Sequence, residues 1–273
     1  MTVSCVSDLR RELAERARAL AHRDDILSYE SLGRFPTVLF EEAPDRATHG
    51  NFHPKSWLRI LANPEWAKRL AKQHQRKSAL PPGKRAGARE MDSSNSSDAL
   101  LMNCFCFPGA SGKMLGARRA LSGAPSFGCS PQILLEGGRV DATEIDMCWD
   151  GVFVEAKLTE RDFTKRQEAV LDRYVMLSEV FDLTALPRSD SQYLHYQLIR
   201  NVLAAHQHGA DFVLLIDSRR PDLETAWQAI HSCIKHDGTR IACQSRTWQE
   251  VAAAAPGELW AFLALKYGIL GRA

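Results

Sequence analysis

Long apolar runs and a signal peptide are both missing from this sequence. Nowhere do eighteen apolar residues run together, and the first thirty residues carry charges in every turn without an apolar stretch. Neither secretion nor a membrane span is therefore indicated, and we expect a cytoplasmic protein with no membrane partner. A strong excess of one charge is missing too, because 35 basic and 33 acidic side chains leave a formal charge of +2. The overall charge therefore does not indicate a class of binding partner.

Paired cysteine motifs are also absent. The seven cysteines form no CxxC pair, so a zinc knuckle or a disulfide framework is not indicated, and we expect buried or inert thiols. The chain does have an ordinary globular composition, with 45% apolar and 25% charged residues among 273. It can bury a substantial core, which excludes disorder throughout.

Helical patterns dominate the N-terminal part of the chain. Leu9, Leu13 and Ala17 lie at helical spacing within residues 8–23, which predicts an amphipathic surface helix. A second helical pattern surrounds Trp57 and is interrupted by Asn63 and Pro64, so we expect two helices there. His49 and His53 stand four residues apart in HGNFHP, but the glycine and proline argue against a helix, and we expect loop or packing residues.

The segment from Lys68 to Arg89 holds eight basic side chains and no acidic one, and its second half is rich in Pro, Gly and Ala. This composition predicts a flexible basic connector, either solvated or in contact with nucleic acid. We expect residues 1–91 to form a helical N-terminal extension with this connector, and residues 92–273 to form the main domain.

The pattern becomes regular after Ser130 and predicts an alternation of strands and helices. Strands are expected at 133–135, 142–148, 152–158, 211–217 and 240–244, and helices at 163–182, 191–208, 223–235 and from 248 and 258. The resulting order, βββ, αα, β, α, β, α, predicts an α/β fold with a mixed central sheet flanked by helices.

A hairpin is predicted within EIDMCWDGVFVEAKLTE, residues 144–160. Asp150-Gly151 is a strong two-residue turn signal, because both turn positions need positive φ. A turn there pairs Trp149 with Val152 and places Asp146 directly opposite Glu155, on the same face as Glu144 and Lys157. Like charges opposed in this way destabilise a sheet.

Three arrangements could offset that repulsion: a divalent cation between the carboxylates, a proton shared by them, or neutralisation by Lys157. A solvated hairpin face with an ion pair from Glu144 to Lys157 is the structural alternative. The apolar run GVFVEAK favours a central strand instead, and so favours a catalytic site with a Mg²⁺ ion at the two carboxylates.

At these residues the chain resembles the restriction-endonuclease-like superfamily, also called PD-(D/E)XK nucleases. Asp146 matches the first motif carboxylate, Glu155 the second and Lys157 the lysine of the E-x-K triplet. Ile145 stands where the motif name shows proline, a replacement that the superfamily tolerates. The likeness covers residues 92–273 and suggests an uncharacterised bacterial branch.

The resemblance implies a restriction-endonuclease-like core and Mg²⁺-dependent hydrolysis of phosphodiester bonds in DNA, with Mn²⁺ as an alternative metal. Asp146, Glu155 and the Ala156 carbonyl would hold the metal, with Glu144 beside them, and Lys157 would position or activate water. The basic connector and residues 111–119 would contact the DNA backbone. Whether the protein forms a homodimer is left open by the sequence.

Further residues are suggested by the superfamily pattern. Many members carry a glutamine on a helix after the hairpin, and Gln197 occupies such a position, with Arg200 one turn later on the same face. Some members add an upstream acidic residue, for which Asp98 and Glu136 are both candidates. The alternative to an enzyme is a non-catalytic nucleic-acid-binding or assembly module that keeps the nuclease fold, although the intact motif argues against it.

Overall fold

The computed structural model describes residues 5–271 and divides into two compact units. The first unit contains residues 1–120, 156–160 and 247–273, and the second contains 121–155 and 161–246. The boundary expected after residue 91 lies inside the first unit, and the assignment of 92–273 to a nuclease core stays a prediction. Residues 1–4, 272 and 273 of the two predicted domains lie outside the described residues.

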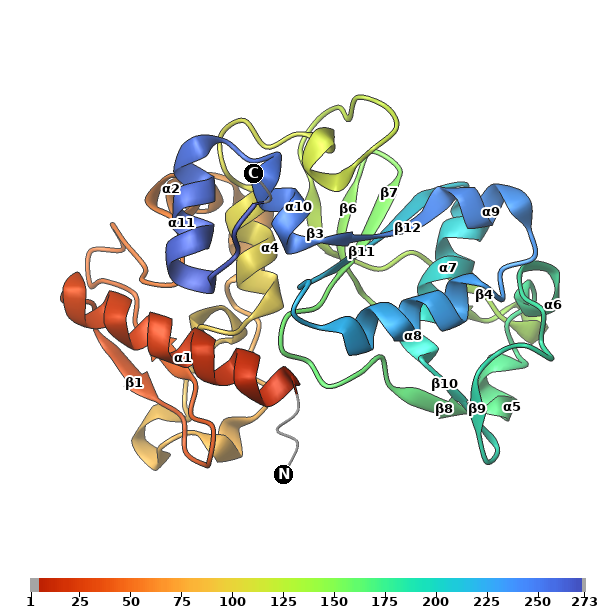
Figure 1. Ribbon diagram of the computed structural model, residues 1–273, viewed down its shortest axis with the longest axis horizontal. Coiled ribbons are helices and arrows are strands. Elements are labelled where there is room, and N and C mark those ends of the chain that lie inside the picture. Colours follow the sequence, from red (N-terminus) through yellow and green to blue (C-terminus); the bar gives the residue numbers. More distant parts are fainter. Residues whose placement is uncertain (1–4, 272–273) are drawn as a thin grey trace. The chain divides into compact units, whose positions relative to one another are not determined.

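Helices are the longest regular elements of the first unit (Figure 1). α1 (Cys5–Arg23) buries the predicted apolar stripe and contacts α11 (Gly257–Tyr267). α2 (Pro54–Ala62) ends and α3 (Pro64–Arg69) begins at Asn63, whose side-chain oxygen accepts hydrogen bonds from the next helix. The predicted division into two helices is thus confirmed, since proline cannot continue the first helix but suits the first turn of the second. Other elements of this unit are β1 (Ser28–Glu30), β2 (Val38–Phe40), α4 (Ser97–Phe105), η4 (Gly112–Leu115) and α10 (Trp248–Ala253).

The basic segment 68–89 is folded, and the prediction of a flexible connector was wrong. It contains short 3₁₀ turns, η1 (Lys77–Ala79) and η2 (Pro82–Lys84), and leads into η3 (Glu90–Asp92). The backbone of His74 donates to Ala88, and Leu80 is fully buried. Composition alone missed this because it shows neither these contacts within the segment nor the acidic partners outside it, such as Asp98 and Glu41.

The second unit contains a five-stranded mixed sheet in the order β12-β11-β7-β6-β3. Its strands are β3 (Ser126–Cys129), β6 (Ile145–Trp149), β7 (Val152–Ala156), β11 (Asp211–Ile216) and β12 (Cys243–Thr247). β7 is central, as its apolar sequence predicted. The strand predicted at 133–135 is not part of this sheet, because β4 (Ile133–Leu134) pairs instead with β5 (Val140–Asp141). The edge strand β3 was not predicted.

Residues 163–182 do not form the single helix that we predicted. They contain β8 (Lys165–Gln167), α5 (Glu168–Leu171) and α6 (Leu177–Val180), and β8 joins a small sheet with β9 (Arg188–Ser189) and β10 (Gln192–Leu194). The buried residues Leu171, Tyr174 and Leu177 are linked by backbone bonds three residues apart instead of four. Pairing with the distant strand β10 therefore overrides the local helical spacing.

The core of the second unit includes residues of the sheet and of two helices, α7 (Tyr196–His208) and α8 (Pro221–His231). A third helix, α9 (Asp237–Ala242), contacts α7 and β11 (Figure 1). Apolar residues of β11, such as Phe212 and Leu214, pack with Leu198 and Val202 of α7 and Trp227 of α8. No helix within residues 5–271 has both the length and the apolar content needed to cross a membrane.

One pair of cysteines departs from the expectation of buried or inert thiols without a disulfide framework. Cys129 of β3 and Cys148 of β6 form a disulfide. Because β3 pairs with β6, this bond depends on a strand that the sequence did not predict. Burial raises the pKa of the other buried thiols, Cys104, Cys106, Cys233 and Cys243, as expected for inert groups. Disulfides are uncommon in the reducing cytoplasm, so the cytoplasmic location stays a prediction.

Candidate active site

The hairpin between β6 and β7 has the turn and the register that the sequence predicted. Asp150 and Gly151 have φ values of 45° and 76°, as a type I′ turn requires. The strands pair Trp149 with Val152, Cys148 with Phe153 and Met147 with Val154. One further step in this antiparallel register places Asp146 opposite Glu155.

Asp146 and Glu155 lie on one face of the hairpin. Along β6, Ile145, Met147 and Trp149 are buried, whereas Asp146 and Cys148 are only half-buried. Cross-strand partners share a face, so Glu155 lies with Asp146, Cys148 and Phe153. Helix α7 approaches this face, because Phe153 packs against the core cluster that α7 helps to form.

The carboxylate of Glu155 is buried and held by a side chain of α7. Its exposed fraction is 3%, and its Oε2 atom accepts a hydrogen bond of 2.9 Å from Nδ2 of Asn201, which is fully buried. A buried carboxylate needs such donors. The amide supplies one without adding a positive charge.

The two α7 residues suggested by the sequence differ in their surroundings. Gln197 is half-buried in the first turn of the helix. Arg200 is only 3% exposed and donates to the carbonyl oxygen of Glu144 and to the side chain of Asn201. A buried guanidinium is poorly placed to contact a phosphate. The surroundings of Arg200 therefore do not support the phosphate contact that was expected of Gln197 and Arg200 together.

The lysine of the motif follows β7 in the segment 156–160, which belongs to the first unit. Lys157 is 6% exposed. Its carbonyl oxygen accepts a 2.9 Å hydrogen bond from Nε1 of Trp248, and the next amide, of Leu158, donates to Oε2 of Glu160. These contacts fix the backbone on either side of the lysine. That its ammonium acts together with Asp146 and Glu155 stays a prediction.

The donor set at the hairpin suits a hard cation. Mg²⁺ commonly binds through one or two carboxylates together with waters, and Asp146 and Glu155 supply two. Glu144 is exposed just before β6. Within residues 5–271 no three His, Cys, Asp or Glu side chains group closely enough to form a metal-ligand cluster, so an ion here would rely on few carboxylates and on other oxygen donors, such as the predicted Ala156 carbonyl.

Comparison with known families agrees with this architecture. The family described as "Restriction Endonuclease associating with ARP" matches residues 16–268. The chain belongs to this family. Neither a curated protein nor a solved structure matches the sequence. Membership in a restriction-endonuclease family, together with the central mixed sheet and its flanking helices, confirms the predicted restriction-endonuclease-like fold.

Sequence reasoning missed one residue in this family member, Asn201. It follows Gln197 by four positions on α7, so the two share a helix face. That spacing was the available signal, but it cannot show which side chain contacts the strand. The hydrogen bond between Asn201 and Glu155 joins residues 46 apart in sequence, and only the packing of α7 against the sheet reveals it.

The two candidate upstream acids have different environments. Asp98 of α4 is buried and paired with Arg69 and Lys72 in the first unit. Burial raises its pKa, but the two cations outweigh that effect and hold the pKa below its usual value. Glu136 is exposed in the 3₁₀ turn η5 (Glu136–Gly138). Participation of either residue in the site stays a prediction.

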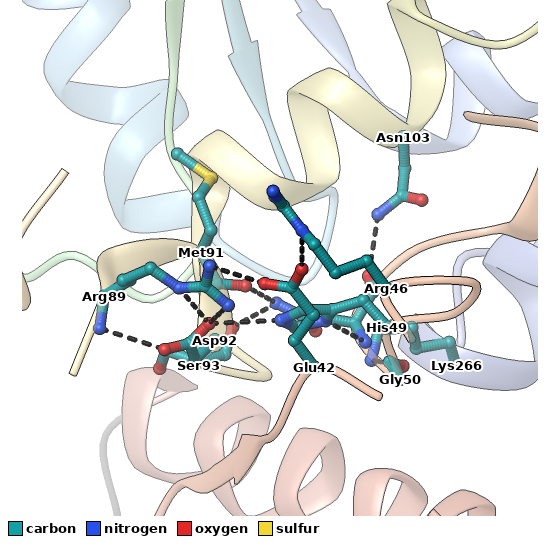
Figure 2. A network of polar contacts seen from close by, with 11 residues as sticks. Glu42, Arg46, His49, Gly50, Arg89, Met91, Asp92, Ser93, Asn103 and Lys266 are labelled. Atoms are coloured by element: carbon teal, nitrogen blue, oxygen red, sulfur yellow. Dashed lines mark hydrogen bonds and ion pairs between the residues drawn. The ribbon is translucent and has the colours of Figure 1, made fainter. Parts of the chain in front are cut away.

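His49 belongs to a buried polar network in the first unit (Figure 2). Its Nε2 lies 3.1 Å from Asp92, and its Nδ1 accepts from the backbone of Asn51. Asp92 also pairs with Arg89, which in turn pairs with Glu42. Burial lowers the pKa of His49 despite Asp92. Both ring nitrogens make polar contacts inside the first unit, which confirms the prediction that His49 is a loop or packing residue.

Most charges of the basic segment are already paired inside the first unit. Lys68, Arg69, Lys72, Lys84 and Arg89 each form an ion pair with an acidic side chain. Arg76 is exposed, as are Lys113, Arg118 and Arg119 of the second basic segment. The net positive charge offered by residues 68–89 is therefore smaller than the sequence suggests.

Proposed function

We propose that this protein is a metal-dependent nuclease that hydrolyses phosphodiester bonds in DNA. The observation that supports the proposal is the hairpin register, which pairs Trp149 with Val152, Cys148 with Phe153 and Met147 with Val154 on the central strand β7. Extending this register by one residue would set Asp146 opposite Glu155. Two acidic side chains that face each other across strands are unfavourable without a cation or a proton between them. Membership in a restriction-endonuclease family also supports a nuclease function.

Each site residue has a defined task in this proposal. Asp146 and Glu155 hold Mg²⁺ or Mn²⁺, together with the Ala156 carbonyl. Glu144, the further metal ligand expected from the sequence, does not group with these two carboxylates into a three-ligand cluster within residues 5–271. When bound, the ion would polarise a phosphoryl oxygen and acidify a water molecule. Lys157 orients the attacking water or stabilises charge on the phosphoryl group, and Gln197 assists in positioning the substrate.

DNA is the proposed partner, held through its phosphates. The exposed basic side chains Arg76, Lys113, Arg118 and Arg119 are suited to such contacts. Binding through phosphates should weaken steeply as salt concentration rises. Because phosphate contacts carry no base information, these side chains would support affinity without indicating a recognition sequence.

A cleavage assay tests the proposal. Linear, circular and single-stranded DNA are incubated with the purified protein, with and without Mg²⁺ or Mn²⁺. We expect metal-dependent cleavage, and a loss of about a hundredfold or more in Asp146→Asn and Lys157→Ala. Asp172→Asn, which changes an exposed carboxylate of the second unit, serves as the matched control.

Circular dichroism must show that the variants remain folded. Full cleavage by both site variants would refute the assignment of the site. Salt-sensitive DNA binding without cleavage, under all metals and substrates, would instead indicate the non-catalytic nucleic-acid-binding module.

A further inference from the structure

We infer that Asn201 is a positioning residue for the Glu155 carboxylate and that Arg200 fixes the orientation of the Asn201 amide. The inference rests on the proposed function, in which Glu155 holds the metal. Neither α7 residue belongs to the sequence motif, and their role follows from contacts within the second unit.

The contact between Asn201 and Glu155 lies away from solvent. Nδ2 of Asn201 donates to Oε2 of Glu155 at 2.9 Å, and the two residues are 0% and 3% exposed. Water therefore competes poorly for either group, and an unmade bond would leave a buried polar group unsatisfied. The bond holds one oxygen of the carboxylate and so restricts the rotation of the Glu155 side chain.

Arg200 determines which way the amide faces. Its Nε and Nη2 atoms lie 3.0 Å and 2.6 Å from Oδ1 of Asn201. A guanidinium only donates hydrogen bonds, so it must face the amide oxygen, and the amide NH₂ group must face Glu155. If the Asn201 amide were rotated by half a turn, it would lose the hydrogen bonds from Arg200, and its oxygen would face the Glu155 carboxylate.

The neutral charge of the amide matters for a metal site. A lysine or arginine at position 201 would neutralise Glu155 and compete with a cation for its oxygens. An amide orients the carboxylate without adding a positive charge beside it. Groups that hydrogen-bond to metal ligands commonly contribute to affinity in this way.

Arg200 also connects the two strands of the hairpin through α7. Its Nη2 donates to the carbonyl oxygen of Glu144, at 3.0 Å, immediately before β6. The hydrogen bonds that the structure gives Arg200 all go to neutral oxygens, although the residue is only 3% exposed. Its charge also helps to lower the pKa of Asp141, so a carboxylate partly compensates this buried guanidinium. In the inferred role, Arg200 fixes both the backbone before Asp146 and, through Asn201, the carboxylate of Glu155.

Titration calorimetry with Mn²⁺ on the full chain tests the inference without relying on activity. We expect Asn201→Ala to bind Mn²⁺ at least about tenfold more weakly than the wild type, the range seen when a partner of a metal ligand is removed. Asn103→Ala is the matched control. Asn103 is also fully buried, and its amide donates to Asn51 and Ala99 in the first unit.

The control should lower the melting temperature without changing Mn²⁺ affinity. Arg200→Lys provides an independent variant that keeps the charge but cannot supply the two-point contact to Oδ1, and we expect weaker binding there too. Wild-type affinity in a folded Asn201→Ala or Arg200→Lys variant would overturn the positioning role alone. A wild-type protein that neither binds Mn²⁺ nor cleaves DNA would overturn the proposed function and this role with it.

Discussion

Two buried carboxylates of this protein are compensated in different ways. Asp98 is paired with two cations, Arg69 and Lys72. Glu155 receives a hydrogen bond from the neutral amide of Asn201. Both contacts satisfy a carboxylate that lies away from water. The ion pairs of Asp98 indicate a structural role for that residue.

Removing the Asp98 carboxylate should destabilise the first unit strongly. Asp98→Ala leaves Arg69 and Lys72 without their acidic partner, and loss of one member of a buried pair costs about 3 kcal/mol or more. Urea unfolding at pH 7 measures the change. Glu65→Gln, which breaks the exposed pair with Lys68, is the control and should cost less than about 0.5 kcal/mol. Similar losses in the two variants would contradict the buried ion-pair network.

The stability from Asp98 should depend on pH in the acid range. Its folded-state pKa lies below the usual value because Lys72 and Arg69 outweigh the effect of burial. A depressed pKa stabilises the fold above the unfolded-state pKa, near 4, and this stability is lost as pH falls through the folded-state pKa. Acid unfolding monitored by circular dichroism should therefore be less steep in Asp98→Asn than in the wild type.

At the scale of elements, the tight turn and the disulfide both fix the proposed active-site hairpin. Asp150 at the turn accepts hydrogen bonds from the backbone and hydroxyl of Ser122. The disulfide joins β6 to β3 from its position on the same face as Asp146. The hairpin is thus held at its turn and at its edge.

The turn should tolerate a side chain poorly at its second position. Gly151→Ala forces a non-glycine residue to φ 76° and should cost about 1–2 kcal/mol. Gly257→Ala is the control, because no heavy atom lies within 4 Å of an added Cβ there and alanine favours the first turn of α11. Thermal unfolding measures both. Equal stability of the two variants would show that position 151 is not constrained.

Reducing the Cys129–Cys148 bond should also destabilise the second unit. The cysteines are 19 residues apart, and closing a loop of that length stabilises a fold by about 3 kcal/mol. Urea unfolding of the wild type with reductant should match that of the Cys129→Ser/Cys148→Ser variant. The variant itself should not respond to reductant, and Cys5→Ser should still respond. A reductant effect in the double variant would point to another cause.

At the scale of the whole molecule, the chain passes repeatedly between its two units. Residues 156–160 and 247–273 return to the unit that contains the N-terminal helices. Helix α11 packs against α1, and α4 packs against α2. The expected division after residue 91 would separate both pairs.

A fragment of residues 92–273 should therefore fold incompletely. It lacks α1 and α2, so the buried faces of α4 and α11 would meet water. By circular dichroism, we expect less helix per residue in this fragment than in the full chain. We also expect the fragment, unlike the full chain, to bind a hydrophobic dye. A fragment of residues 121–246, which keeps the core cluster of the second unit, is the comparison. Cooperative unfolding of 92–273 near the melting temperature of the full chain would support the predicted boundary.

The predictions that held depend on short stretches of sequence. Asp150-Gly151 encodes the turn, alternation along β6 and β7 fixes their register, and Asn63-Pro64 separates two helices. The predictions that failed depended on distant partners. The local pattern of residues 163–182 is helical, but β8 within this segment pairs with β10. The composition of residues 68–89 is typical of a linker, but Asp98 anchors Arg69 and Lys72.

The sequence by itself determined the hairpin turn and the register of its strands, because a two-residue turn leaves only one register. That Asp146 and Glu155 face each other follows from this register as a prediction. Only the tertiary structure decided what surrounds them. The Asn201 amide, the Arg200 guanidinium and the Cys129–Cys148 bond come from segments far apart along the chain. Contacts of that kind are set by how α7 and β3 pack against β6 and β7, and local patterns do not encode such packing.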